Sequence, residues 1–182
     1  MPYEPPRLEL TDATAILEVL THHGVRFVVI GGFAALLQGS PFPTNDVDIT
    51  PSADHENYVR LSAALTELEA KVRAPNTKPL KFNHDADSLA AVAVWNLSTK
   101  FGDLDISAVP AGTTGYQDLV RDATGVTIRG VHISLSSLAD IVRSKGAANR
   151  DKDRRVLPVL RELVGEQTKA RAESRRRKRE PL

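Results

Sequence analysis

The stretch that decides the fold is Val28–Thr50, "VVIGGFAALLQGSPFPTNDVDIT". An apolar run at 26–30, "RFVVI", stops at a pair of glycines and predicts a short buried strand. A helical segment follows at 33–38 and ends at Gly39-Ser40-Pro41. The stretch closes with "DVDIT" (46–50), whose alternating polarity predicts a second strand. A packed core does not need this order of elements, whereas a protein that holds a polyphosphate and a metal ion does.

The two aspartates of the second strand, Asp46 and Asp48, are separated by one residue and therefore point to the same face of the strand. Side-by-side carboxylates repel each other, and core packing does not reward them. Mg²⁺ and Mn²⁺ accept such oxygen ligands, typically together with substrate phosphates and water. A third carboxylate from a neighbouring strand would complete a two-metal site of the kind that clamps a phosphoryl group during transfer. The pair therefore predicts a catalytic metal site.

A later acidic strand, "FGDLDIS" (101–107), offers the third ligand. Asp103 and Asp105 share one face of this strand, and the pleat allows either to serve. The alternative for each acidic pair is a solvated strand edge or turn. For Asp85 and Asp87, which lie in the polar stretch "NHDADS", a loop is the preferred interpretation.

The glycines before the acidic pair favour a phosphate-binding turn. A strand that ends in Gly31-Gly32 before a helix exposes backbone N–H groups to whatever lies above it. Gly39 and Ser40 could approach the same ligand closely. Thr44 lies two residues before Asp46, so its hydroxyl is expected to face the metal site.

The rest of the chain continues the alternation of helices and strands. The predicted elements include a polar connection over 74–88, strands within 89–97 and 103–109 joined by a turn at 99–102, and a hairpin or bent strand over 126–134 with Gly130 at its turn. A long amphipathic helix is predicted over 54–73, with Tyr58, Leu61, Leu65 and Leu68 on its buried face. From Leu135 onward the pattern is helical, with a kink expected at Pro158. The predicted fold class is α/β (α+β): a mixed β-sheet core with flanking helices and a small C-terminal helical portion.

Composition limits the function classes. The chain has 182 residues, 41% of them hydrophobic, which suits one globular domain. It contains no cysteine, so disulfides, thiolate metal sites and a cysteine nucleophile are excluded. No apolar run approaches a membrane span, and a cytoplasmic protein without membrane contact is expected. The net charge of +1 hides a basic tail over 169–182, which is either a solvated extension or an arm for nucleic acid.

In this order the motifs resemble the nucleotidyltransferase superfamily with a DNA-polymerase-β-type core, and within it the AbiEii-type toxin branch of toxin–antitoxin systems. The resemblance covers residues 26–160. The matching pieces are Gly31-Gly32, Gly39, "TNDVD" (44–48), Asp105 in "GDLDI", and "KGAANRDKD" (145–153). The chain departs from the family pattern at Phe42, where an arginine is common, and at Val156, where an acid is common.

The resemblance implies a role for each matched residue. Asp46, Asp48 and Asp105 would bind the catalytic Mg²⁺ (or Mn²⁺) ions, and Asp105 would also activate the acceptor hydroxyl. Lys145 would act with them by neutralising phosphate charge. The residues expected at the nucleotide are Gly31, Gly32, Gly39, Ser40, Thr44, Arg150, Lys152 and Asp153. Residues 1–134 would form the catalytic core, 135–165 a helical portion, and 166–182 a basic, flexible tail.

The resemblance also implies an activity. The protein would transfer a nucleoside monophosphate from an NTP to an RNA acceptor, with the tRNA 3′ end favoured, and so block translation. A cognate antitoxin would then be its partner. Transfer to a small molecule or to a protein is the alternative within the enzyme class. A catalytically silent module that binds RNA or a partner is the alternative outside it, although clustered carboxylates would be costly in an idle site.

Overall fold

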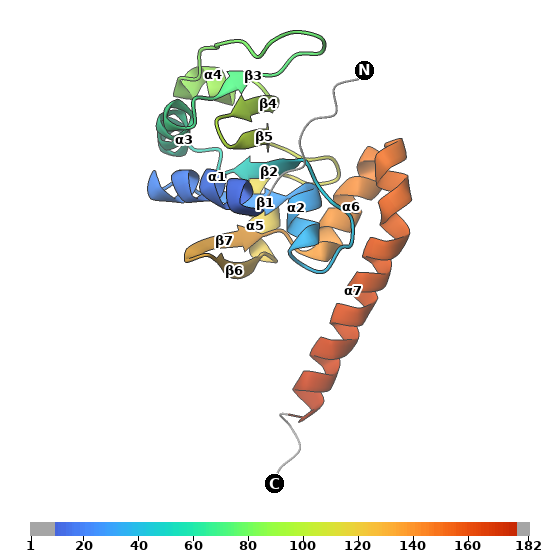
Figure 1. The fold of residues 1–182 in the computed structure, drawn as a ribbon. Coiled ribbons are helices and arrows are strands. Elements are labelled where there is room, and N and C mark those ends of the chain that lie inside the picture. Colours follow the sequence, from blue (N-terminus) through green and yellow to red (C-terminus); the bar gives the residue numbers. More distant parts are fainter. Residues whose placement is uncertain (1–9, 178–182) are drawn as a thin grey trace.

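The computed structural model describes residues 10–177 and contains one seven-stranded mixed sheet with flanking helices (Figure 1). The helices are α1 (Leu10–His22), α2 (Gly31–Leu36), α3 (His55–Glu67), α4 (Ala86–Ala90), α5 (Tyr116–Arg121), α6 (Leu138–Ala148) and α7 (Asp151–Arg177). The strands are β1 (Phe27–Ile30), β2 (Asp46–Pro51), β3 (Lys71–Val72), β4 (Val94–Thr99), β5 (Gly102–Ser107), β6 (Thr124–Ile128) and β7 (Val131–Leu135). The predicted fold class is confirmed.

The strand order in the sheet is β3-β4-β5-β2-β1-β7-β6. Two neighbouring pairs, β2 with β5 and β1 with β7, run parallel, and the other pairs are antiparallel. The parallel pairing of β2 with β5 matters most, because these two strands carry the acidic motifs. It brings segments more than fifty residues apart in the chain to adjacent positions at the centre of the sheet.

Alternation along the strands gives the sheet an apolar face and a polar face. Val47 and Ile49 of β2 are fully buried, and Leu104 and Ile106 of β5 pair with them in the same register. Helices α1 and α3 supply their buried residues to this same core. Asp46 and Asp48 consequently lie on the opposite face, where Asp46 pairs with Asp103 and Asp48 with Asp105.

Both predicted hairpins are present. β4 and β5 pair antiparallel up to Thr99 and Gly102, and β6 and β7 turn at Arg129 and Gly130. Both turn residues of the second hairpin have positive φ, at 50° and 86°. This is the backbone geometry of the two-residue turns that match the right-handed twist of paired strands.

One predicted boundary differs from the structure, and two short helices were not predicted. The helix expected over 54–73 ends at Glu67, because the chain turns at Glu69 (φ 54°) and enters β3. Its expected buried stripe from Tyr58 to Leu68 is confirmed. The short helices α4 and α5 were not predicted, since neither is long enough to show helical periodicity. Asp85, assigned to a loop, caps α4 by accepting a hydrogen bond from the Ser88 N–H.

Helix α7 is longer than the sequence predicts. It continues through Pro158, which removes one backbone hydrogen bond without ending the helix. The boundary expected at residue 166 lies inside α7, and the helix continues to Arg177, while 178–182 lie outside the described residues. The C-terminal half of α7 projects away from the body of the protein (Figure 1). Within residues 10–177, no helix combines the length and apolar character needed to cross a membrane.

Candidate active site

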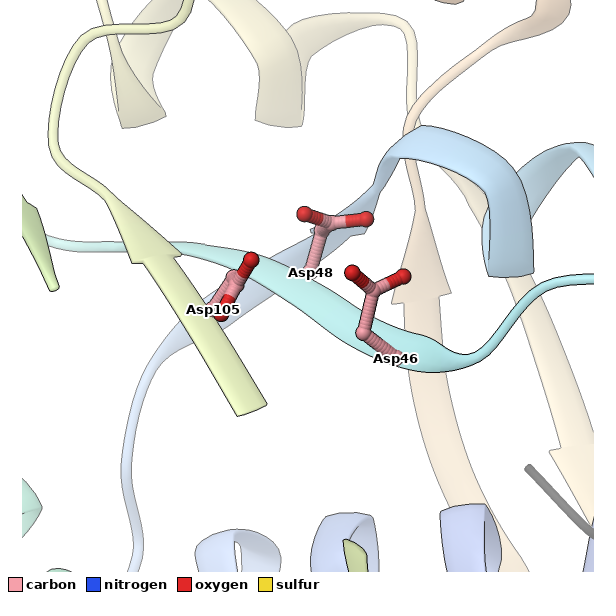
Figure 2. Close-up of side chains that lie close together, drawn as sticks. All are labelled: Asp46, Asp48 and Asp105. Carbon is pink, nitrogen blue, oxygen red and sulfur yellow. The ribbon is translucent and has the colours of Figure 1, made fainter. Parts of the chain in front are cut away.

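Three carboxylates converge on the polar face of the sheet. One carboxylate oxygen from each of Asp46, Asp48 and Asp105 lies within 4.8 Å of the other two. Figure 2 shows the three side chains approaching one another from β2 and β5. Both Asp103 and Asp105 share this face, but Asp105 stands opposite Asp48 and completes the group. Oxygen atoms at these separations can share a divalent cation of the size of Mg²⁺ or Mn²⁺.

Asp48 lies beside two other carboxylates, and these surroundings disfavour its charged form. Burial, followed by the negative charges of Asp46 and Asp105, raises the pKa of Asp48 to about 7. Lys145 and Lys152 act in the opposite direction and only partly offset these effects. Burial also raises the pKa of Asp105. Bound divalent cations would neutralise this charge, so the donor set fits Mg²⁺ chemically.

Arg73, which the sequence did not identify, lies beside the third carboxylate. Its guanidinium donates to Asp103 Oδ2 at 2.7 Å and forms a second, shorter ion pair with Asp105 Oδ1. The backbone N–H of Arg73 is fixed by the carbonyl of Asn96 on β4. Arg73 directly follows β3, and the sheet order β3-β4-β5 brings it near Asp105. No local sequence pattern connects the two residues.

The Gly-Gly turn packs directly against the carboxylates. Gly31 has a φ of 65°, a conformation that favours glycine, and begins α2. A Cβ on Gly31 would meet the carboxylate of Asp48, with Cγ only 3.0 Å away. A Cβ on Gly32 would lie 3.0 Å from the hydroxyl of Thr44. Glycine is therefore required at position 31, where the strand end approaches the acidic pair, and a side chain at position 32 would press on Thr44.

The hydroxyl of Thr44 points toward the metal site, as expected. Thr44 Oγ1 lies 3.1 Å from Asp46 Oδ1 and 3.2 Å from the carbonyl of Asp46. Because the hydroxyl donates to the carboxylate, it holds one of the converging side chains in place.

The lysine motif is organised around Asp153. Lys145 Nζ donates to Asp153 Oδ1 at 3.1 Å, and Arg150 Nε donates to Asp153 Oδ2 at 2.7 Å. Asn149, in the left-handed conformation, ends α6 and allows α7 to begin with Asp153 facing Lys145. Burial alone would raise the pKa of Asp153, but the hydrogen bonds from Arg150 and Lys145 outweigh it and lower the pKa. Asp153 is thus a buried anchor for both cations.

A cavity of about 560 Å³ lies beside the three carboxylates, between the polar face of the sheet and helices α6 and α7. Ten of the twelve predicted site residues line it: Gly31, Gly32, Ser40, Thr44, Asp46, Asp48, Asp105, Lys145, Arg150 and Lys152. The two others do not reach it. Gly39 is exposed and faces Leu163 of α7, and Asp153 is buried behind Lys145. Phe42 and Val156, where the chain departs from the family pattern, also line the cavity.

Several lining residues were not predicted. Asn96 stands opposite Asp105 in the sheet, and Ser107 follows Asp105 on the same face. Ser136 is buried, and its hydroxyl has no hydrogen-bond partner within the described part of the chain. Strand pairing brings Asn96 and Ser107 to the cavity, and Ser136 reaches it directly after the end of β7. These residues could be predicted only from the order of the strands, and no local sequence pattern reveals that order.

The fold and this site define the protein as a nucleotidyltransferase. More narrowly, the chain belongs to the aminoglycoside-2''-adenylyltransferase family, because that family model matches residues 12–160. The superfamily expected from the sequence is thereby confirmed, while the narrower resemblance to the AbiEii-type toxin branch stays a prediction. No curated protein is close enough in sequence to match the chain.

Solved structures share this fold. A lincosamide antibiotic adenylyltransferase with lincomycin bound has a TM-score of 0.59 at 15% identity and covers 87% of this chain and 99% of its own. ANT(2'')-Ia in complex with adenylyl-2''-tobramycin has a TM-score of 0.53 at 16% identity, covering 92% and 97%. An antigenic nucleotidyltransferase-like protein from Paracoccidioides brasiliensis has a TM-score of 0.50 at 17% identity, covering 92% of both chains. At these identities the likeness concerns the fold.

Proposed function

We propose that the protein transfers a nucleoside monophosphate from an NTP to a hydroxyl group of a small molecule. The observation that carries this proposal is the convergence of Asp46, Asp48 and Asp105 at the wall of a cavity that also holds a glycine turn and Lys145. The family to which the chain belongs and the adenylyltransferases that share its fold support the reaction type.

The reaction assigns distinct parts to the residues of the site. The acceptor oxygen attacks the α-phosphorus of the NTP, the bond from that phosphorus to the bridging oxygen breaks, and pyrophosphate leaves. Asp105 would accept the proton of the attacking hydroxyl. Lys145, anchored by Asp153, and Lys152 offer positive charge to the departing phosphates.

Mg²⁺ is the cofactor that the donor set fits. Asp46, Asp48 and Asp105 would hold it, and when bound it would neutralise the phosphates and polarise the α-phosphoryl group. Neighbouring side chains orient two of these carboxylates. Thr44 orients Asp46, and Arg73 holds one oxygen of Asp105.

A small acceptor is favoured over RNA because the matched family and the adenylyltransferases that share the fold are named for antibiotic acceptors. The RNA acceptor, with the tRNA 3′ end and an antitoxin partner, is the second candidate. The feature that favours it is the basic C-terminal end of α7, which projects from the body and carries Arg175, Arg176 and Arg177 in its last turn (Figure 1). A catalytically silent module is a weaker candidate, since an idle site gains nothing from a half-buried carboxylate such as Asp48 beside two others.

The experiment that tests the proposal uses purified protein, Mg²⁺ and each α-³²P-labelled NTP in turn. Lincomycin, tobramycin and total cellular RNA serve as separate acceptors, and the double variant Asp46→Ala/Asp48→Ala serves as the control. We expect label on a small molecule with one preferred NTP, and none with the control. A labelled band of tRNA size with no labelled small molecule would replace the proposal with the RNA candidate.

A measurement of nucleotide binding distinguishes an incorrectly proposed acceptor from an incorrectly proposed reaction. Equilibrium binding of a non-hydrolysable NTP is measured with Mg²⁺ and with EDTA, in wild type and in the same double variant. We expect binding that depends on both the metal and the two aspartates. The absence of any metal-dependent binding would contradict nucleotidyl transfer as a whole.

A further inference from the structure

The end of the cavity that receives the acceptor follows from the register of β4 and β5. Asn96 pairs with Asp105 at the position of the metal site, and Val94 pairs with Ser107 one step farther along the same face. Val94, Asn96 and Ser107 all line the cavity, as do Pro110 and Ala111 from the loop after β5. The glycine turn and Lys145 lie with the acidic pair of β2, where the triphosphate is proposed. The segment around Val94 and Pro110 is therefore the acceptor end.

Apolar side chains are exposed at this end. Val94 is 51% exposed, and Val109, which precedes the lining residue Pro110, is 58% exposed. Val92, two residues before Val94, is also exposed. Half of the large apolar side chains that are exposed among the described residues therefore lie at this corner of the protein. A ligand that covers an apolar surface beside the reactive centre binds more tightly, because removing that surface from water is favourable.

The same end offers no carboxylate to a cationic ligand. Within residues 10–177, the acidic residues that line the cavity are Asp46, Asp48, Asp105 and Asp140. The first three form the metal site, and Arg73 already neutralises Asp105. Asp140 is paired with Arg143 at 2.9 Å and accepts a hydrogen bond from the Ser137 hydroxyl at 2.8 Å.

Positive charge is instead present along the lining. Lys145, Arg150 and Lys152 all reach the cavity, and Arg150 is 59% exposed in spite of its bond to Asp153. These cations face the proposed phosphates, so the lining offers no free carboxylate as a partner for a ligand with several ammonium groups. The polar groups that remain, Asn96, Ser107 and Thr113, can hydrogen-bond to hydroxyl or amide groups.

We infer that the acceptor is a hydroxylated molecule with an apolar portion and at most one positive charge, and not a polyamine sugar. Its apolar portion packs against Val94 and Pro110, while one of its hydroxyls reaches Asp105. This inference rests on the proposed function and specifies the acceptor of the same site.

The test compares two antibiotics as probes of acceptor chemistry. Lincomycin carries alkyl groups and a lone basic amine, whereas tobramycin carries several amines. Transfer of label to each is measured as kcat/KM for wild type, Val94→Asp and Val59→Asp. Val59, on α3, is also 51% exposed but lies outside the cavity, which makes it the matched control. Thermal unfolding of each variant reports whether it folds, and Val94→Thr supplies a change of the same shape without charge.

We expect wild type to prefer lincomycin over tobramycin by about tenfold or more in kcat/KM. Val94→Asp should lower kcat/KM for lincomycin and reduce the preference for lincomycin over tobramycin by about tenfold. Val94→Thr should lower kcat/KM for lincomycin less. Val59→Asp should change neither kcat/KM for lincomycin nor the preference. A wild-type preference for tobramycin, or a preference that Val94→Asp leaves unchanged, would overturn the inference. Label on neither antibiotic, with metal-dependent NTP binding intact, would overturn the inferred acceptor class alone. Loss of that binding would contradict the proposed function itself.

Discussion

The guanidinium of Arg73 is paired with the carboxylate of Asp105, the third member of the acidic group. Arg73 Nη2 donates to Asp105 Oδ1, and Arg73 Nη1 donates to Asp103 Oδ2 at 2.7 Å. Asp103, which the sequence could not separate from Asp105, therefore has a different part: it anchors the arginine. A carboxylate that is held in this way has fewer orientations available to it beside the metal site.

Removal of this arginine is expected to weaken metal binding. In Arg73→Gln the neutral amide no longer fixes Asp105, and the affinity for Mn²⁺ in the presence of a non-hydrolysable NTP should fall by about ten- to a hundredfold. Arg73→Lys retains charge without the planar fork and should fall in between. Electron paramagnetic resonance of Mn²⁺ measures the binding directly. As a control, Arg26→Gln breaks the 2.6 Å pair with Asp54 away from the site and should leave Mn²⁺ affinity unchanged. Equal effects of the two glutamine variants would show that Arg73 is a general stabilising residue.

The pH dependence of metal binding should follow Asp48. Burial and the neighbouring carboxylates raise its pKa to about 7, so below this pH a bound cation must displace a proton. Affinity for Mn²⁺ should therefore increase by about tenfold from about pH 6 to about pH 8, with release of a proton at the lower pH. Isothermal titration calorimetry in two buffers of different ionisation enthalpy measures both quantities.

The stability of the metal-free protein should show the opposite trend. A carboxyl whose pKa is higher in the folded than in the unfolded state stabilises the fold at low pH, and this contribution is lost as the pH rises through the folded value. Asp48→Asn should remove that part of the pH dependence of the melting temperature between the ordinary carboxyl pKa of 3.8 and about 7. An unchanged profile in this variant would contradict the assignment.

Gly31 is expected to tolerate no side chain. Gly31→Ala places a Cβ against the carboxylate of Asp48 in a backbone conformation that costs about 1–2 kcal/mol for a residue other than glycine. Both the free energy of unfolding and metal-dependent NTP binding should decrease. Gly165→Ala in α7 has open space around it and should instead stabilise the protein by about 0.5–1 kcal/mol. Urea unfolding of the two variants gives the comparison, and a Gly31→Ala protein with normal stability and NTP binding would contradict it.

The anchor of the lysine motif should matter for stability as well as for activity. Asp153 is fully buried, and Asp153→Asn leaves Lys145 and Arg150 without their common counter-charge, at a cost of about 2–4 kcal/mol. Asp151→Asn removes an exposed partner of Arg154 and should cost less than about 1 kcal/mol. Chemical denaturation of both variants measures the difference. Equal costs would mean that Asp153 does not act as the common anchor.

The sequence by itself determined the pieces whose geometry is local. The period of a strand places Asp46 and Asp48 on one face, and the preference of glycine for positive φ marks Gly31 as a turn beside them. The period also gave the buried stripe of α3 and the two hairpins. It could not give the end of α3 or the short helices α4 and α5, because packing and capping decide such boundaries.

Only the tertiary structure decided which distant groups meet. The parallel pairing of β2 with β5 selects Asp105 as the third carboxylate, and the position of β3 at the sheet edge brings in Arg73. The antiparallel pairing of β4 with β5 places Val94 beyond Asp105 and makes one end of the cavity apolar. These contacts depend on strand order and register, which arise from the burial of the whole apolar face and leave no mark in any single stretch of sequence.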